Sequence, residues 1–236
     1  VSILTQFFAP AEQSSIPLLV PSENLLTANS IYQSTTMGAT ILGFALGDPL
    51  LKFFKGILLI FGIKGGEFLL LPLFYLLSAY FISKIQLTEK RKGTFKRNLL
   101  SELKDGFKVL KRKSTVRRAM FHLVFLYSLL AALYVLSINL SSAIKVLGPT
   151  NFGVLLAVCG IGICIGAIYM AQIGNKIQPR KITYVGQSLI IFSLILLGYS
   201  KGSLFMTLFL CCLLGIGASF IAIPAQTTLQ TDTPKD

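Results

Sequence analysis

Apolar runs of about 20 residues recur along the chain, separated by short polar or basic segments. A helix of about this length crosses the hydrocarbon core of a bilayer. Residues 50–63 are also apolar but contain Lys52 and Lys55, so we expect them to lengthen the first helix outward or to lie at the interface. Residues 1–8 look like the end of an earlier span. The pattern predicts an all-α, polytopic bundle of membrane helices with six spans: 27–47, 66–83, 119–140, 153–173, 182–200 and 203–224.

Composition favours a membrane protein over a soluble one. Hydrophobic residues make up 53% of the chain and charged residues 13%, whereas soluble domains carry about 25% charged residues. Four cysteines lie in apolar runs without zinc-binding spacing, so we expect packing residues, no metal and no cofactor. The sequence has no zinc-protease motif, no serine-hydrolase motif and no nucleotide-binding P-loop, which argues against an enzyme.

The basic residues gather on one side of the predicted membrane. With six spans, residues 84–118, residues 174–181 and the C-terminal tail share a side and hold 13, 3 and 1 of the 22 Lys and Arg residues. Loops rich in Lys and Arg face the cytoplasm, so this side is expected to be cytoplasmic, in the inner membrane of a bacterium. The net charge of +13 then serves orientation and the binding of acidic lipids, and not of nucleic acid.

A motif at the start of the chain returns near its end. Residues 10–16 (PAEQSSI) match residues 224–229 (PAQTTL) with one residue skipped, and residues 21–23 (PSE) match residues 234–236 (PKD). The offset is 214 residues before the skip and 213 after it. Six helices between the copies keep both on the cytoplasmic side, and an even number predicts two parallel halves related by an axis along the membrane normal.

This repeat predicts three parts. Residues 1–83 close an N-terminal half, residues 84–118 form a basic cytoplasmic linker, and residues 119–236 open a C-terminal half. Within the linker, four apolar residues share one helical face, which predicts an amphipathic helix held on the membrane surface by acidic lipids. These residues are Leu99, Leu103, Phe107 and Leu110.

Three phrases resemble the major facilitator superfamily, in particular its drug and siderophore exporter-like branch. The phrase FFAPAEQSSIPLLVPSENLLTANSIYQ resembles the junction of the fourth and fifth helices, and IPAQTTLQTDTPKD resembles the matching junction after the tenth. The phrase NFGVLLAVCGIGICIGA resembles the start of the eighth helix. The resemblance covers essentially the whole chain. It implies a twelve-helix fold of which the first four and the last two helices lie outside this sequence.

Two motifs of this family are altered here. The fifth-helix pattern G-P-x-x-G-G corresponds to residues 43–48 (GFALGD), with phenylalanine for the proline and aspartate for the last glycine. The pattern G-x-x-x-D-R-x-G-R-R after the eighth helix corresponds to residues 174–181 (GNKIQPRK), which keep basic residues but no acid. The resemblance implies a cytoplasmic gating loop that contains Lys176, Arg180 and Lys181.

The resemblance also implies a function. We expect a monomeric secondary active transporter that exports a small amphipathic molecule by alternating access, with protons as a candidate coupling ion. No acidic residue lies well inside a predicted span, so Glu12 and Asp48 are the candidates within this chain to carry a proton. The alternative is a membrane scaffold or receptor that keeps the fold without transport, which the altered loop and the missing buried acids favour.

Polar and aromatic side chains on two spans are candidates to line a substrate pathway. A polar side chain in hydrocarbon is costly unless it faces protein or water. The same residues could instead form hydrogen bonds to a neighbouring helix or pack in the ordinary way. The candidates are Asn29, Gln33, Thr36, Thr40, Tyr127, Tyr134 and Asn139.

Small residues spaced three and four apart mark helix faces that neighbouring backbones can approach closely. Residues 153–174 carry such a series of Gly, Ala and Cys, and residues 203–225 carry another. These faces serve static packing, or they let helices slide during alternating access. The expected packing glycines are Gly43, Gly47, Gly160, Gly174 and Gly215.

Overall fold

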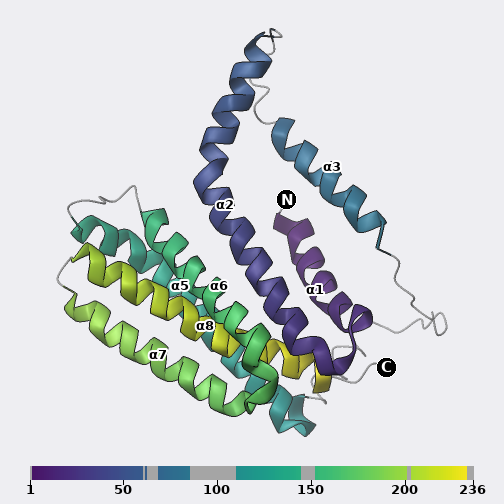
Figure 1. The fold of residues 1–236 in the computed structure, drawn as a ribbon, viewed down its shortest axis with the longest axis vertical. Coiled ribbons are helices and arrows are strands. Elements are labelled where there is room, and N and C mark those ends of the chain that lie inside the picture. The colour runs from purple at the N-terminus through teal and green to yellow at the C-terminus, as the bar shows by residue number, and fades with distance from the viewer. Residues whose placement is uncertain are drawn as a thin grey trace.

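The structure, a computed structural model, describes residues 2–60, 62, 69–85, 110–144, 152–200 and 203–232, except for the side chains of residues 2–5, 44, 45, 48 and 175. These ranges contain helices and no strand, which confirms the predicted all-α class (Figure 1). The helices in chain order are α1 (Ser2–Leu19), η1 (Ser22–Asn24), α2 (Leu25–Ile60), α3 (Leu70–Ser83), α5 (Ser114–Ala143), α6 (Phe152–Ile173), η4 (Gly174–Lys176), α7 (Pro179–Tyr199) and α8 (Leu204–Asp232).

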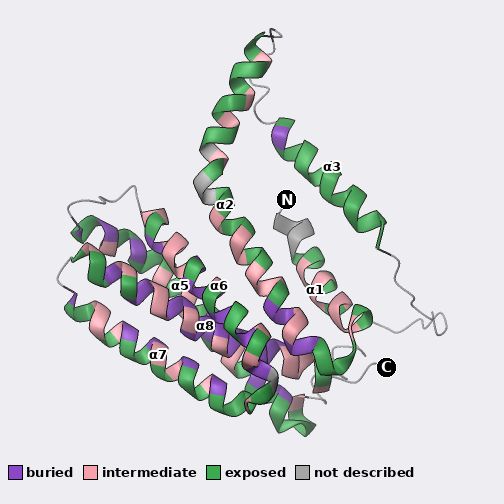
Figure 2. Ribbon diagram, viewed as in Figure 1, coloured by how far each residue is buried: buried purple, intermediate pink, exposed green. Residues whose placement is uncertain are grey.

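Helix α8 lies at the centre of the bundle, in contact with α5, α6, α7 and the first half of α2 (Figure 1). Burial follows this arrangement, since the buried residues of the bundle concentrate along α8 and the faces turned toward it (Figure 2). One apolar cluster joins Leu126 of α5, Ile163 of α6, Ile190 of α7 and Leu214 of α8. The outer faces expose large apolar side chains, as expected where lipid replaces water.

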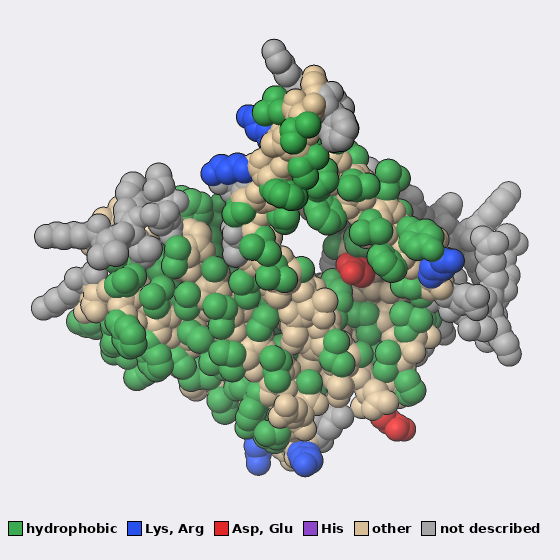
Figure 3. Space-filling view, turned by 45° about the horizontal axis from the view of Figure 1, so that its top comes forward, with side chains coloured by type: hydrophobic (Ala, Val, Ile, Leu, Met, Phe, Trp, Pro, Cys, Tyr) green, Lys and Arg blue, Asp and Glu red, His purple; other side chains and the backbone are tan. Residues whose placement is uncertain are grey.

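Four described helices are long and apolar enough to cross a membrane: α5, α6, α7 and α8. They contain or closely match the predicted spans 119–140, 153–173, 182–200 and 203–224. Figure 3 shows one face covered mostly by hydrophobic side chains, with Lys and Arg at its margins. Length, composition and surface therefore agree on a multi-pass membrane protein.

The two earlier predicted spans correspond to α2 and α3. Span 27–47 belongs to α2, which continues without a break to Ile60, so residues 50–60 lengthen this helix and form no separate span. Helix α2 is not among the four apolar helices. The described part of span 66–83 is α3, with 14 residues, and residues 66–68 of this span lie outside the described residues.

Most of the predicted linker helix, residues 99–110, lies outside the described residues. The described part of the linker ends in the first turn of α5, where Lys113 Nζ donates a hydrogen bond to the backbone carbonyl of Asp232 at 2.6 Å. The start of α5 and the end of α8 therefore meet. Together with the start of α2, the end of α6 and the start of α7, they form what we call the basic end of the bundle.

Residues 10–16 and 224–229 of the repeated motif are helical, and the expected junction after the first copy lies at residues 20–24, between α1 and α2. Pro10 lies inside α1 and Pro224 inside α8. The polar residues after Pro224 remain helical, and the hydroxyls of Thr227 and Thr228 are satisfied within the helix by donating to the carbonyls of Ile223 and Pro224, at 2.9 and 2.8 Å. The two copies also approach each other at the basic end, where α1 contacts α8.

Candidate functional site

A seam between α2 and α6 follows the small-residue stripe of α6. A Cβ built on Gly160 would lie 3.2 Å from the Ile41 side chain, and one built on Gly174 would meet the side chain of Leu26. Between them, Cys164 Sγ donates to the Ser34 carbonyl at 3.4 Å. The stripe thus faces α2 across the seam. Its side chains are small, so the surface that α6 presents to α2 is nearly smooth.

Closer glycine contacts hold α8 against α6 and α7. A Cβ on Gly215 would collide with the Cys159 carbonyl of α6, and one on Gly162 of α6 would collide with the Cys212 carbonyl of α8. A Cβ on Gly186 of α7 would lie 2.7 Å from the carbonyl of a glycine in α8. These contacts are backbone to backbone, so neither partner can move aside without separating the helices.

The five predicted packing glycines therefore behave differently. Gly160, Gly174 and Gly215 lie in tight helix contacts, whereas Gly43 and Gly47 in α2 have no atom within 4 Å of a built Cβ. The sequence pattern missed another group of closely packed glycines, on a second face of α6 and on α7 and α8. This group is Gly162, Gly166, Gly186 and Gly217.

A polar junction closes the seam at the basic end. Asn29 is 1% exposed, and its Nδ2 donates to Thr227 Oγ1 at 3.1 Å and to Gln230 Oε1 at 2.6 Å. Gln230 Nε2 in turn donates to the backbone carbonyl of Gln13 at 3.1 Å. The sequence left Asn29 as a pathway residue or as a hydrogen-bond donor to a neighbouring helix, and the structure shows the hydrogen bonds to α8. The junction also joins the two copies of the repeat, through Gln13 in the first and Gln230 just after the second.

Two further polar contacts flank this junction. The Tyr32 hydroxyl of α2 donates to Glu12 Oε2 of α1 at 3.1 Å. Gln226 Nε2 of α8 donates to the Tyr127 hydroxyl of α5 at 3.2 Å. Glu12 thus holds α1 on α2, and buried Gln226 finds its partner at the exposed edge of α5.

The remaining pathway candidates lie on two helices, α2 and α5. Gln33 is half-buried, and Thr36 and Thr40 are exposed with hydroxyls that donate to their own helix at 2.9 and 2.8 Å. Tyr134 is half exposed and packs edge-on against Phe152, with ring centroids 5.9 Å apart. A further candidate on α5, Asn139, is exposed.

The whole chain, residues 1–236, matches the family model described as Major Facilitator Superfamily. The chain belongs to the Major Facilitator Superfamily. It is thus a multi-pass membrane transporter in general terms, from a family that is not an enzyme class. No curated protein and no solved structure matches the chain.

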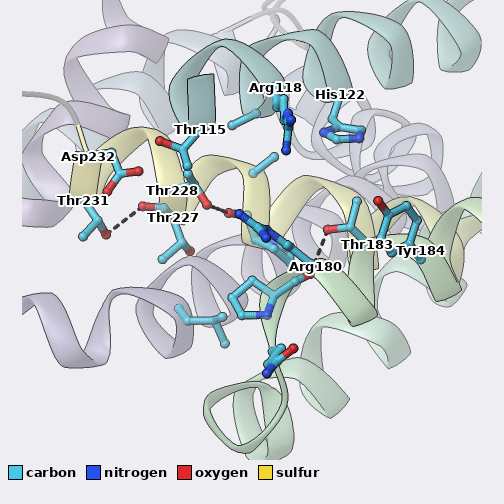
Figure 4. A pocket seen from close by; sticks show the side chains of 16 residues that line it. Thr115, Arg118, His122, Arg180, Thr183, Tyr184, Thr227, Thr228, Thr231 and Asp232 are labelled. Carbon is cyan, nitrogen blue, oxygen red and sulfur yellow. Dashed lines mark hydrogen bonds between the residues drawn. The ribbon is translucent and has the colours of Figure 1, made fainter. Parts of the chain in front are cut away.

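In this Major Facilitator Superfamily chain, the predicted gating residues lie where α6 is followed by α7: Lys176 is in η4, and Arg180 and Lys181 are in the first turn of α7. Lys176, Arg180 and Lys181 are all exposed, and Arg180 lines a cavity of about 600 Å³ at the basic end (Figure 4). The loop sequence has no acid, but Asp232 of α8 lines the same cavity. Among the described residues, no group of three or more His, Cys, Asp or Glu side chains is placed to hold a metal ion.

Proposed function

We propose that this Major Facilitator Superfamily chain exports a small amphipathic molecule by alternating access, in the inner membrane of a bacterium with the basic end in the cytoplasm. The observation that best supports this proposal is the seam between α2 and α6. On the proposed division of the chain, α2 belongs to the N-terminal half and α6 to the C-terminal half. The seam is therefore a contact between halves, where a smooth stripe of small residues lets the halves rock.

The junction around Asn29 acts as the cytoplasmic gate in this proposal. Its three hydrogen bonds, two from Asn29 and one from Gln230, each contribute about 0.5–1.5 kcal/mol net. Together they contribute about 1.5–4.5 kcal/mol. A ligand that inverts a two-state equilibrium from 1:99 to 99:1 needs about 5.5 kcal/mol of differential binding. A gate of this strength keeps its end closed at rest and opens when substrate or a proton binds.

The exposed polar faces beyond the gate supply the proposed pathway. Thr36 and Thr40 of α2 and Tyr127 and Tyr134 of α5 are all exposed, and tyrosine offers both a stacking surface and a hydroxyl. Such a lining suits a cargo with one apolar and one polar part. This is the basis for the proposed amphipathic substrate.

Glu12 is the proposed proton carrier. Its carboxylate accepts a hydrogen bond from Tyr32 and lies one residue from Gln13, a member of the gate. Protonation removes the charge that the Tyr32 hydroxyl bonds, which weakens the contact between α1 and α2 next to the gate. A proton on Glu12 would thereby favour opening.

A double-cysteine experiment tests the gate and the function together. With the four native cysteines replaced by alanine or serine, Asn29→Cys and Thr227→Cys place two thiols where 3.1 Å now separates the side-chain atoms. Oxidation should cross-link the gate and stop efflux of a fluorescent dye panel from expressing cells, and reduction should restore efflux. The matched control pairs Ile31→Cys, an exposed position on another face of α2, with Thr227→Cys, which should neither cross-link nor lose efflux.

Two results would count against the proposal. Efflux that continues through a complete cross-link would show that the α2–α8 junction does not gate transport. Equal dye accumulation in expressing and empty cells across the whole panel, with the protein present in the membrane, would favour the scaffold or receptor alternative.

A further inference from the structure

A second polar site borders the gate, between α5, α7 and α8, and shares Thr227 with it. It is a cavity of about 600 Å³ at the basic end, lined by the first turns of α5 and α7 and the last turns of α8 (Figure 4). Leu26 of α2 also lines it. The volume falls within the range of about 300–1,000 Å³ that small-molecule sites occupy. The proposed pathway between the halves makes no use of it.

Cationic side chains converge on this cavity from two helices. In Figure 4, Arg118 points into it from α5, and Arg180 crosses it from the start of α7 toward Thr228. His122 lies one turn beyond Arg118 and lines the same space. Among the described residues, no ion pair or hydrogen bond engages either guanidinium. Asp232 is the acid among the lining residues, so two arginines against one aspartate leave a formal charge of +1 with His122 neutral.

Three threonine hydroxyls that line the cavity present acceptors and not donors. Thr183, Thr228 and Thr231 donate their hydroxyl protons to backbone carbonyls of their own helices, at 3.0, 2.8 and 2.8 Å. Each oxygen keeps lone pairs that can accept from a ligand. The cavity therefore has a donor side, made by the two guanidiniums, and an acceptor side, made by the threonines of α8 and Asp232.

We propose that this cavity binds a phosphate ester that carries free hydroxyl groups, the chemistry of a glycerophosphate. Guanidinium groups hold phosphate oxygens in paired, charge-assisted hydrogen bonds. Arg118 and Arg180 take the phosphate, and the ligand's hydroxyls donate to the threonine oxygens and to Asp232. The same chemistry occurs in a soluble ester and in a lipid headgroup at the membrane surface, where the starts of α5 and α7 would lie.

The test measures binding of both sources to the intact protein. Sn-glycerol 3-phosphate is titrated calorimetrically into detergent-purified protein. Phosphatidylglycerol is offered in phosphatidylcholine nanodiscs, with bound lipid counted by native mass spectrometry. The double variant Arg118→Gln/Arg180→Gln should weaken binding at least about tenfold, because it removes charged hydrogen bonds. The matched control is Arg112→Gln/Arg117→Gln, which loses the same charge from exposed arginines outside the cavity and should bind like the wild type.

Each outcome of this experiment either supports or overturns the proposed site. The site is supported if Arg118→Gln/Arg180→Gln loses binding and the control double variant does not. Binding of the lipid only then identifies a headgroup site, and binding of the soluble ester as well identifies a metabolite site. Equal loss in both pairs would mean general attraction to positive charge and overturns the proposal, as does a wild type that binds neither probe. If the double variant does not elute like the wild type on size exclusion, Arg180→Gln alone carries the test, since Arg180 is exposed.

Discussion

Replacing Gly215 with alanine is the sharpest test of the packing described here. A Cβ at this position would lie 2.8 Å from the backbone nitrogen of Ile163 and would collide with the Cys159 carbonyl. Ordinary contact begins at about 3.4 Å, so α6 and α8 must separate locally by at least about 0.6 Å. A radial gap of about 0.5–1 Å forfeits a quarter to a half of the attraction between the separated atoms.

The expected cost is that of overpacking a close helix contact, about 1–3 kcal/mol. In a chain of this size, 1 kcal/mol lowers the melting temperature by about 2–4 °C. Gly215→Ala should therefore lower it by about 2–12 °C, measured by heating the intact protein in detergent and following its size-exclusion peak. The control is Gly198→Ala on α7, where a Cβ meets nothing within 4 Å and alanine improves helix propensity.

The control should melt at the wild-type temperature or slightly above it. The reasoning would be refuted if Gly215→Ala were as stable as the wild type, or if both variants lost the same amount. Either result would mean that the contact between α6 and α8 is looser than the backbone geometry requires.

Three further predictions concern single side chains. Asn29→Leu should lower stability by about 1–3 kcal/mol, because it leaves Gln230 without a buried partner, whereas Gln33→Leu at the half-buried next turn should change the thermal midpoint little. Glu12→Gln should keep a hydrogen bond to Tyr32 but abolish the difference in dye efflux with and without a proton ionophore; an unchanged ionophore effect would remove Glu12 from the coupling role. Ser193→Ala should leave the melting temperature unchanged or raise it, because the Ser193 hydroxyl is buried without a hydrogen-bond partner, and a clear loss would reveal a partner.

The sequence alone determined the helices, because their signal is local. Runs of about 20 apolar residues have to form helices in a bilayer, where every backbone polar group must be bonded within its own segment. The positions of α5, α6, α7 and α8 could therefore be predicted within a few residues at most ends. The end of α8 was the exception, since TTLQTD reads as a polar junction until its threonines are seen to bond back to their own helix.

Only the tertiary structure decided which helix each face meets. Spacing along α6 revealed one stripe of small residues, but it could not show that this stripe faces α2 while Gly162 and Gly166 face α8. The pairing of Asn29 with Gln230, 201 positions apart, was equally hidden. The physical reason is that periodicity depends on neighbours within one helix, whereas a contact between helices depends on how their axes cross. In this chain, that crossing is set by backbone contacts at glycines from different helices.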